Sequence, residues 1–282
     1  MKRACQTEKF KTNKFNSLDH YGIIYQKDLF NRGNQGTILR RHIMPTIFGV
    51  SHILFLLIST TFIVIGLIIF KKHIKTRNTI LISTAFLLLI SIILNRLSLT
   101  FARPDGINYT ELIPMTICGT TSLLFAIFTL VFIKKQNHPV FHFFVYIAIF
   151  GGILNNLFPT YIDQAPSILH PRTITGLLHH TVSMFLGILI VINGEFKPAF
   201  KDSHWLPLGL FFYTSLGLFY MQAFSPRSDN TMNIAEPILP NLNWYTLYAI
   251  IIVLHLLALY AFETIKKKKQ MNRGEDHWTI LQ

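Results

Sequence analysis

Charged residues are scarce in this 282-residue chain, since Asp, Glu, Lys and Arg make up only 14% of it and hydrophobic residues make up 51%. That balance is far from the composition of a soluble enzyme. Cysteine is nearly absent, and a disulfide between Cys5, near the N-terminus, and Cys118, in an apolar stretch, is not expected. The chain also lacks a Gly-x-Ser-x-Gly elbow, a phosphate-binding loop and a dinucleotide fingerprint. These absences exclude the enzyme classes that depend on such motifs.

Long apolar runs are what the chain has in abundance. A helix needs about 20 residues to cross the hydrocarbon core, and lipid leaves helices or closed barrels as the spanning structures. The runs are continuous rather than alternating, which favours helices. We therefore predict an all-α fold, a polytopic transmembrane helix bundle with about seven spans. The stretches are 43–70, 79–101, 112–133, 140–158, 173–193, 205–224 and 243–265.

The formal net charge of +13 comes from Lys and Arg that we assign to tails, connectors and helix ends. Basic runs at 71–77, 134–135 and 266–269 each directly follow an apolar stretch. This is the pattern of stop-transfer signals, and it favours contact with anionic lipid headgroups. We therefore expect membrane lipids as partners and no nucleic acid, while the sequence does not indicate an oligomeric state.

The same charges predict the orientation of the chain. When the connectors and the C-terminal tail alternate between two sides, one side carries 13 Lys and Arg and the other carries four. Residues 1–42 contradict this bias, because they add nine Lys and Arg to the second side. The positive-inside rule then places the C-terminus in the cytoplasm of a multi-pass protein of the cell membrane.

Three regions are expected from this pattern. Residues 1–42 are polar and aperiodic, lack the apolar core of a signal peptide, and are predicted to be a disordered extension, with Met44 as an alternative start. Residues 43–265 form the seven-helix transmembrane domain, and residues 266–282 form a basic cytoplasmic tail.

Cys118 is the first candidate for chemistry, because it lies shallowly below the outer end of the third stretch. Buried cysteines are usually inert, so a reactive Cys118 needs a nearby base or cation. The fifth stretch enters from the same side and places His179 and His180 at a similar depth. Cys and His together are the minimal equipment for nucleophilic acyl transfer. Histidines that only hydrogen-bond between helices remain the alternative.

Four further residues are candidates for substrate binding at that depth. His52, in the first stretch, is expected about one to two turns below the outer face, and Glu111 precedes Cys118 by seven residues on the same helical face. The hydroxyl of Thr116 can stabilise an oxyanion. Asn155 either caps a helix beside Pro159 or orients a ligand. No metal site and no cofactor are expected, because no His-x-x-x-His, Glu-x-x-His or Cys-x-x-Cys lies within a stretch, although His52, His179 and His180 could converge.

Several segments across residues 45–262 together resemble the YwaF-like family of bacterial integral membrane proteins. Residues 113–118 are similar to its Leu-Pro-Leu-His-Leu-Cys motif, but Thr116 stands where the family has His, and Phe219 stands where it has Asn before Tyr. The other similar segments are 48–54, 151–159, 177–180, 219–221 and the group Pro237, Pro240, Trp244 and Tyr245.

This resemblance implies kinship with eukaryotic multipass transacylases that remodel phospholipids through a cysteine in the matching helix. It makes Cys118 the acyl-accepting nucleophile and His180, or His179, its base. The predicted function is therefore a cysteine-dependent phospholipid acyltransferase. The alternatives are a transporter or ligand-binding protein with a His and Glu pocket, which the absence of internal repeats disfavours, and a structural membrane protein without chemistry.

Overall fold

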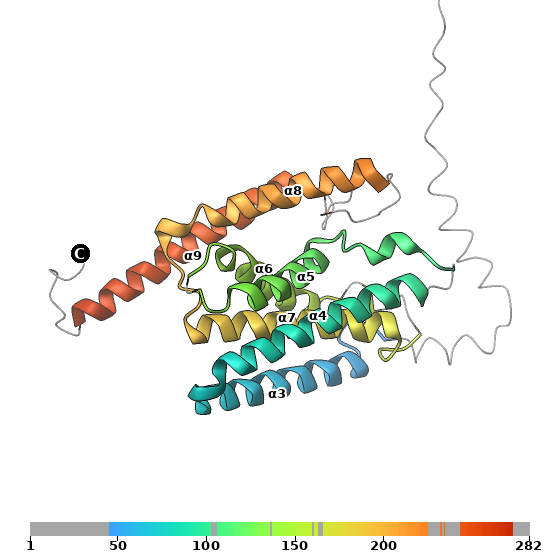
Figure 1. Cartoon of the computed structure of the whole chain (residues 1–282), viewed down its shortest axis with the longest axis horizontal. Helices are drawn as coiled ribbons and strands as arrows, with labels where there is room; N and C mark the ends of the chain where they lie inside the picture. The colour runs from blue at the N-terminus through green and yellow to red at the C-terminus, as the bar shows by residue number, and fades with distance from the viewer. Residues whose placement is uncertain are drawn as a thin grey trace, which may run out of the picture. The chain divides into compact units, whose positions relative to one another are not determined.

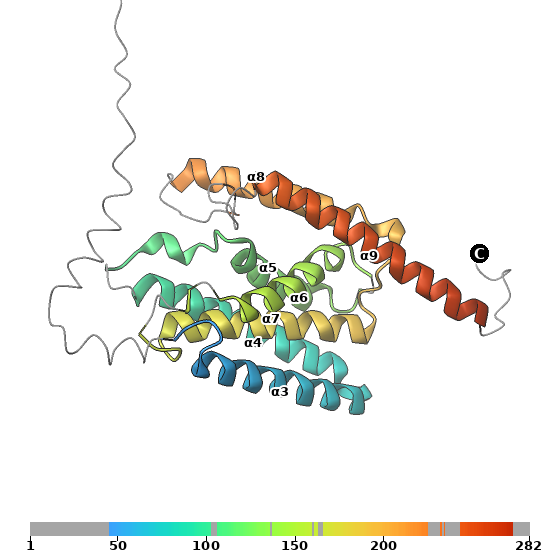
Figure 2. The same ribbon diagram turned by 180° about the vertical axis from the view of Figure 1, so that it is seen from behind.

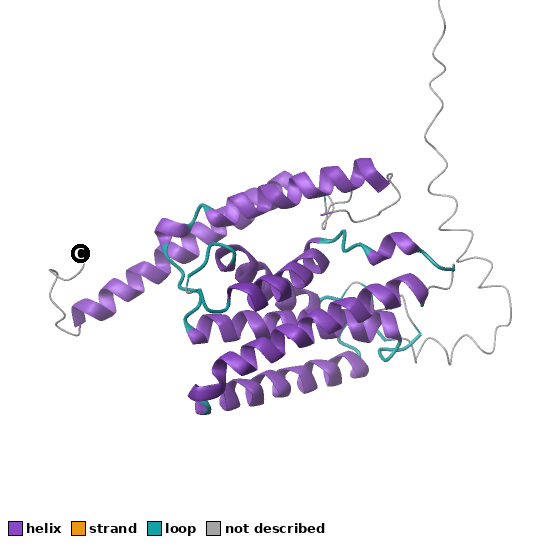
Figure 3. Cartoon of the chain, in the orientation of Figure 1, coloured by secondary structure: helices purple, strands orange, loops and turns teal. Residues whose placement is uncertain are grey.

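The computed structural model describes residues 45–102, 106–135, 137–159, 161–162, 166–224, 232, 234 and 243–272. The predicted extension 1–42 lies outside these residues. Every regular element in the described ranges is helical (Figure 3), so the prediction of an all-α helical bundle is confirmed. The α-helices in these ranges are α3 (Val50–Lys72), α4 (Arg77–Phe101), α5 (Ile117–Phe132), α6 (Phe141–Leu157), α7 (Pro171–Asn193), α8 (Trp205–Phe224) and α9 (Trp244–Asn272).

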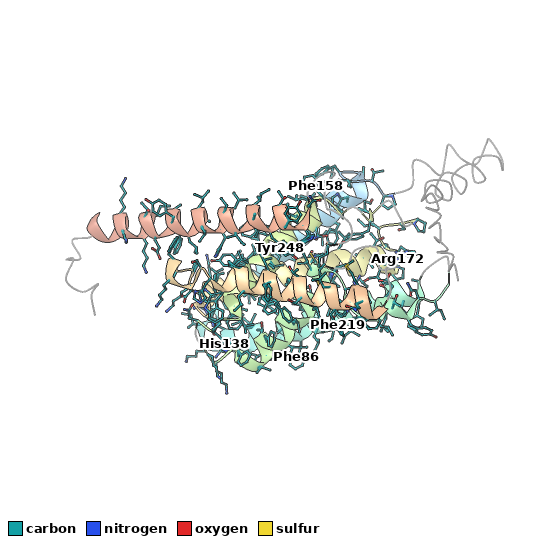
Figure 4. All side chains as sticks on the ribbon, turned by 90° about the horizontal axis from the view of Figure 1, so that it is seen from above. Phe86, His138, Phe158, Arg172, Phe219 and Tyr248 are labelled. Atoms are coloured by element: carbon teal, nitrogen blue, oxygen red, sulfur yellow. The ribbon has the colours of Figure 1, made fainter. Side chains whose placement is uncertain are left out.

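Four of these helices, α3, α4, α7 and α9, are long and apolar enough to cross a membrane. Helices α5 and α6 are apolar but have only 16 and 17 residues, about 24–26 Å at 1.5 Å per residue. Large apolar side chains cover the outside of the bundle, for example Phe86 at 51% and Phe219 at 60% exposure (Figure 4). A surface of this kind is suited to lipid, so the chain is a multipass membrane protein.

Helix α7 is the central element of the bundle. It packs most extensively on α6 and α4 and also contacts α5 and α3. Helix α8 contacts α6 and α9, and α8 and α9 are drawn along the upper side of the bundle in Figures 1 and 2. In an apolar 18-residue segment of α7, 67% is buried inside the protein, whereas only 17% of the corresponding segment of α3 is buried. Polar side chains of α7 therefore face protein rather than lipid, and His179 and His180 belong to this helix.

The start of α5 differs from the prediction. We expected a helix over 112–133, but α5 begins at Ile117. Ile113 is extended, at φ −85° and ψ 125°, which is the conformation that a following proline favours. Thr116 then caps the helix: its Oγ1 accepts a 3.1 Å hydrogen bond from the amide of Gly119. Cys118 consequently lies in the first turn of α5.

The far end of the chain also differs, because α9 continues to Asn272 rather than ending near residue 265. The first part of the predicted basic tail is therefore helical. Lys266 and its neighbours extend the last helix, and cations in that position interact favourably with the negative end of the helix dipole.

Gly152 allows α6 to approach α7 closely. A Cβ at this position would lie 2.6 Å from the Cβ of Met184 and 2.8 Å from the carbonyl oxygen of His180. The second contact is with backbone, so a side chain cannot be accommodated by a change of rotamer. The glycine thus determines how near His180 comes to α6.

Gly152→Ala is expected to destabilise the bundle by about 1–3 kcal/mol, because α6 and α7 must separate. Gly151→Ala is the matched control, since its Cβ would meet the Cys118 Sγ at 3.6 Å, an ordinary contact. Thermal unfolding in detergent, followed by size-exclusion fluorescence, compares the two variants. Equal midpoints would contradict the importance of this close approach.

Candidate active site

Cys118 is the second residue of α5, at the positive end of the helix dipole. The cap at Thr116 pairs the amide of Gly119, and the hydroxyl of Thr120 donates to the carbonyl of Pro114 at 2.5 Å. Nothing in the described part of the chain accepts a hydrogen bond from the amides of Ile117 and Cys118. The thiol therefore stands beside unpaired backbone donors, an arrangement that favours negative charge.

Asn155 of α6 contacts the thiol directly. Its Nδ2 donates to the Cys118 Sγ at 3.4 Å and to the carbonyl of Gly151 at 3.0 Å. Two roles were considered for Asn155, and these hydrogen bonds do not indicate the first of them, which was capping of the helix beside Pro159. The amide instead holds the sulfur in one position and stabilises negative charge on it.

A small cavity of about 10 Å³ lies at the Cys118 sulfur, between α5, α6 and α7. That space is roughly what one water molecule requires. Cys118 and His180 both line it, so two candidates that are far apart in the sequence share one cavity. Its lining comprises Cys118, Thr121, Ser122, Ile147, Ala148, Gly151, Gly152, His180 and Ser183.

The two adjacent histidines make different contacts. Their ring centroids are 4.0 Å apart with the planes at 75°, and both side chains are buried. Nδ1 of His179 donates to the carbonyl of Gly176 at 3.0 Å. Within the described residues, His180 forms no hydrogen bond through its side chain. His180 is thus the histidine that lines the cavity and keeps its ring nitrogens available.

His52 lies in a different place. Its Nδ1 accepts from the amide of Phe48 at 3.0 Å, and its Nε2 donates to the carbonyl of Asn156 at 2.8 Å. Both ring nitrogens are therefore used, and the residue joins α3 to the end of α6. The structure does not bring His52 to the cavity. Among the described residues, no three His, Cys, Asp or Glu side chains are placed to hold a metal ion.

Arg96 is a functional candidate that the sequence analysis missed, because we assigned every Lys and Arg to a tail, a connector or a helix end. It lies inside α4, five residues before the helix ends at Phe101. Its Nη2 donates to Oδ1 of Asn95 at 2.9 Å, and its charge acts on Glu111, His179 and His180. The signal was available: an arginine within the apolar stretch 79–101 is an ionisable group in a membrane helix.

Tyr161 is a second residue that was missed. Its hydroxyl oxygen is buried without a partner in the described part of the chain, and it interacts electrostatically with Cys118. A Cβ on Gly176 would lie 3.1 Å from this oxygen, so the ring fits against α7 one turn before His179. Only the fold places this connector residue near the thiol, and no motif marks it.

The contact between Asn155 and Cys118 leads to a direct prediction. Asn155→Ala is expected to slow alkylation of Cys118 by iodoacetamide about three- to tenfold, as expected for the loss of one hydrogen bond to the thiolate. The rate is measured by intact mass in a Cys5→Ser background, so that one thiol reports. Equal rates in the native state would contradict the role, while equal rates after denaturation serve as the control.

Comparison with protein families matches residues 47–264 to the profile of the TMEM164 family, which is a multipass membrane family. No curated protein matches the chain, and no solved structure does. The matched range nearly coincides with residues 45–262, over which the sequence resembles the YwaF-like family. That resemblance and the kinship with transacylases stay predictions.

Proposed function

The chain belongs to the TMEM164 family, and we propose that it is a membrane-embedded acyltransferase that moves fatty acyl chains between phospholipids through a thioester on Cys118. One observation carries the proposal. Cys118, at the start of α5, and His180, without a hydrogen-bond partner in the described part of the chain, line the same cavity. A thiol, a base and unpaired amides together form the equipment of covalent acyl transfer.

In the first half-reaction, a ring nitrogen of His180 takes the proton from the Cys118 thiol. The sulfur attacks the ester carbonyl carbon of a phospholipid, so that a C–S bond forms and the ester C–O bond breaks. The leaving lysophospholipid oxygen takes the proton from His180. Asn155 holds the sulfur in place by the 3.4 Å hydrogen bond during this step.

In the second half-reaction, the hydroxyl of an acceptor lysolipid gives its proton to His180 and attacks the thioester carbonyl. The new ester C–O bond forms while the C–S bond breaks, and the sulfur takes the proton back. The acyl chain has then moved between two lipids of similar ester energy. The cycle therefore needs no cofactor and no external energy source.

Each half-reaction passes through a tetrahedral oxyanion that requires hydrogen-bond donors. The amides of Ile117 and Cys118 point out of the helix start without partners in the described residues. We assign the role of a third donor to the hydroxyl of Tyr161, which is buried without a partner in the described part of the chain. Thr116 supports this arrangement through the cap, because its side chain occupies the next amide and leaves the first two available.

The location suits a lipid substrate. Cys118 lies at the start of its helix. The sequence predicts that this end lies shallowly below the outer face of the membrane, where phospholipid esters can reach the thiol by lateral diffusion. With the C-terminus in the cytoplasm, as the positive residues predict, the site belongs to the outer half of the cell membrane. Its substrates are then lipids of that leaflet.

The test is transfer by the purified protein in lipid nanodiscs. A donor phospholipid with an isotope-labelled acyl chain and an unlabelled lysophospholipid acceptor are supplied, and mass spectrometry follows the label. We expect labelled chains on the acceptor and a hydroxylamine-sensitive adduct on the protein, with empty nanodiscs as the control. Absence of both products with every phospholipid class supplied would overturn the proposal.

A further inference from the structure

We propose that Arg96 and the apolar pocket beside it form the binding site of the donor phospholipid, with the guanidinium on the headgroup phosphate and an acyl chain in the pocket. This inference rests on the proposed function and names its substrate site. It assigns a recognition role to an arginine that lies inside a membrane helix.

The pocket has a volume of about 160 Å³ and lies between α4 and the segment that leads into α5. Its walls are apolar except for Arg96, and they include Leu97 and Leu112, which are 40% and 42% exposed. The pocket therefore opens to the lipid-facing surface. Its size suits part of a hydrocarbon chain, and its one charge suits an anion.

The guanidinium has donors to spare. Its Nη2 bonds to Asn95, but its Nε is buried and has no partner in the described part of the chain. A buried unpaired donor is costly, and one on a cation more so. If Arg96 only extended its guanidinium group toward water, its Nε would be hydrated rather than buried. A phosphate oxygen satisfies it, because the planar guanidinium binds phosphate with two parallel hydrogen bonds.

The position of Arg96 connects this pocket with Cys118. A Cβ on Gly119, the residue after the nucleophile, would lie 3.6 Å from the Nη2 of Arg96 and 3.3 Å from the Cβ of Pro114. Pro114 itself lines the pocket. In a phospholipid, the ester carbonyls are separated from the phosphate only by the glycerol backbone. A lipid held by its phosphate at Arg96 thus presents an ester to the first turn of α5.

Photocrosslinking tests the site independently of catalysis. A phosphatidylcholine and a diacylglycerol with the same diazirine-labelled acyl chain are each added to the full-length protein in nanodiscs, and labelled peptides are mapped by mass spectrometry. We expect phosphatidylcholine to label residues 92–97 and 112–123 about tenfold more than diacylglycerol does. Cys118→Ala should retain this labelling, so the site can hold even if the acyl-transfer proposal fails.

Arg96→Gln should lower phosphatidylcholine labelling to the level of diacylglycerol, and Arg96→Lys should keep part of it because the charge remains. Arg77→Gln is the matched control, since Arg77 is at the opposite end of α4 and bonds the carbonyl of Phe70. If Arg96→Gln does not fold, the comparison of the two lipids on the wild type still decides. Equal labelling by both lipids there, or phosphatidylcholine labelling unchanged in Arg96→Gln, would overturn the proposal.

Discussion

Cys118→Ala should abolish the acyl adduct and reduce acyl transfer at least about 10³-fold, because the covalent intermediate cannot form without the sulfur. The hydrogen bond from Asn155 loses its acceptor, but Asn155 keeps its bond to the carbonyl of Gly151. The fold should therefore be intact, with an unchanged unfolding midpoint. Transfer of labelled chains and hydroxylamine-sensitive mass on the purified protein measure the two losses.

Two variants make this experiment specific. Cys5→Ser removes the other cysteine and should leave both the adduct and the rate unchanged. Cys118→Ser replaces the thiol by a hydroxyl at the same place. This variant should accept an acyl chain slowly and hold it as an ester that resists hydroxylamine at neutral pH. Full transfer by Cys118→Ala would rule out a covalent intermediate on this sulfur.

The helical fold could be predicted from the sequence because lipid imposes a simple rule. A continuous apolar stretch must form a helix, so α4, α7 and α8 begin and end within two residues of their predicted limits. The ends that differ more are the starts of α3 and α5 and the end of α9. They depend on the local backbone and capping before the helix, and on a polar helix that continues beyond the apolar stretch. Hydropathy contains neither kind of information.

The depth expected for each residue along its apolar stretch brought Cys118 and His180 into one hypothesis. Both helices start on the same side, and the structure lines one cavity with both residues. Rotation about each helix axis could not be predicted, because it depends on packing. For this reason His52, at a similar expected depth, pairs with Asn156 instead, and the contacts of Asn155, Arg96 and Tyr161 emerged only from the structure.

His180→Gln should reduce acyl transfer about 10²- to 10⁴-fold, the usual contribution of a general base. His180 accepts a proton in both half-reactions, so formation of the thioester and its transfer to the acceptor should both be slow. Single-turnover experiments with labelled donor separate the two steps. If His180→Gln slowed only one of these two steps, a second residue would have to act as the base in the other step.

His179→Gln is the matched control, because His179 lies one position earlier and its Nδ1 is engaged with Gly176. It should lower the unfolding midpoint with little effect on the rate. Raising the pH adds a further distinction: hydroxide can form the thiolate without His180, so His180→Gln should regain part of its acylation rate while Cys118→Ala gains none. A larger loss of rate in His179→Gln than in His180→Gln would transfer the role of base to His179, and the cavity would then have to open toward that ring during the reaction.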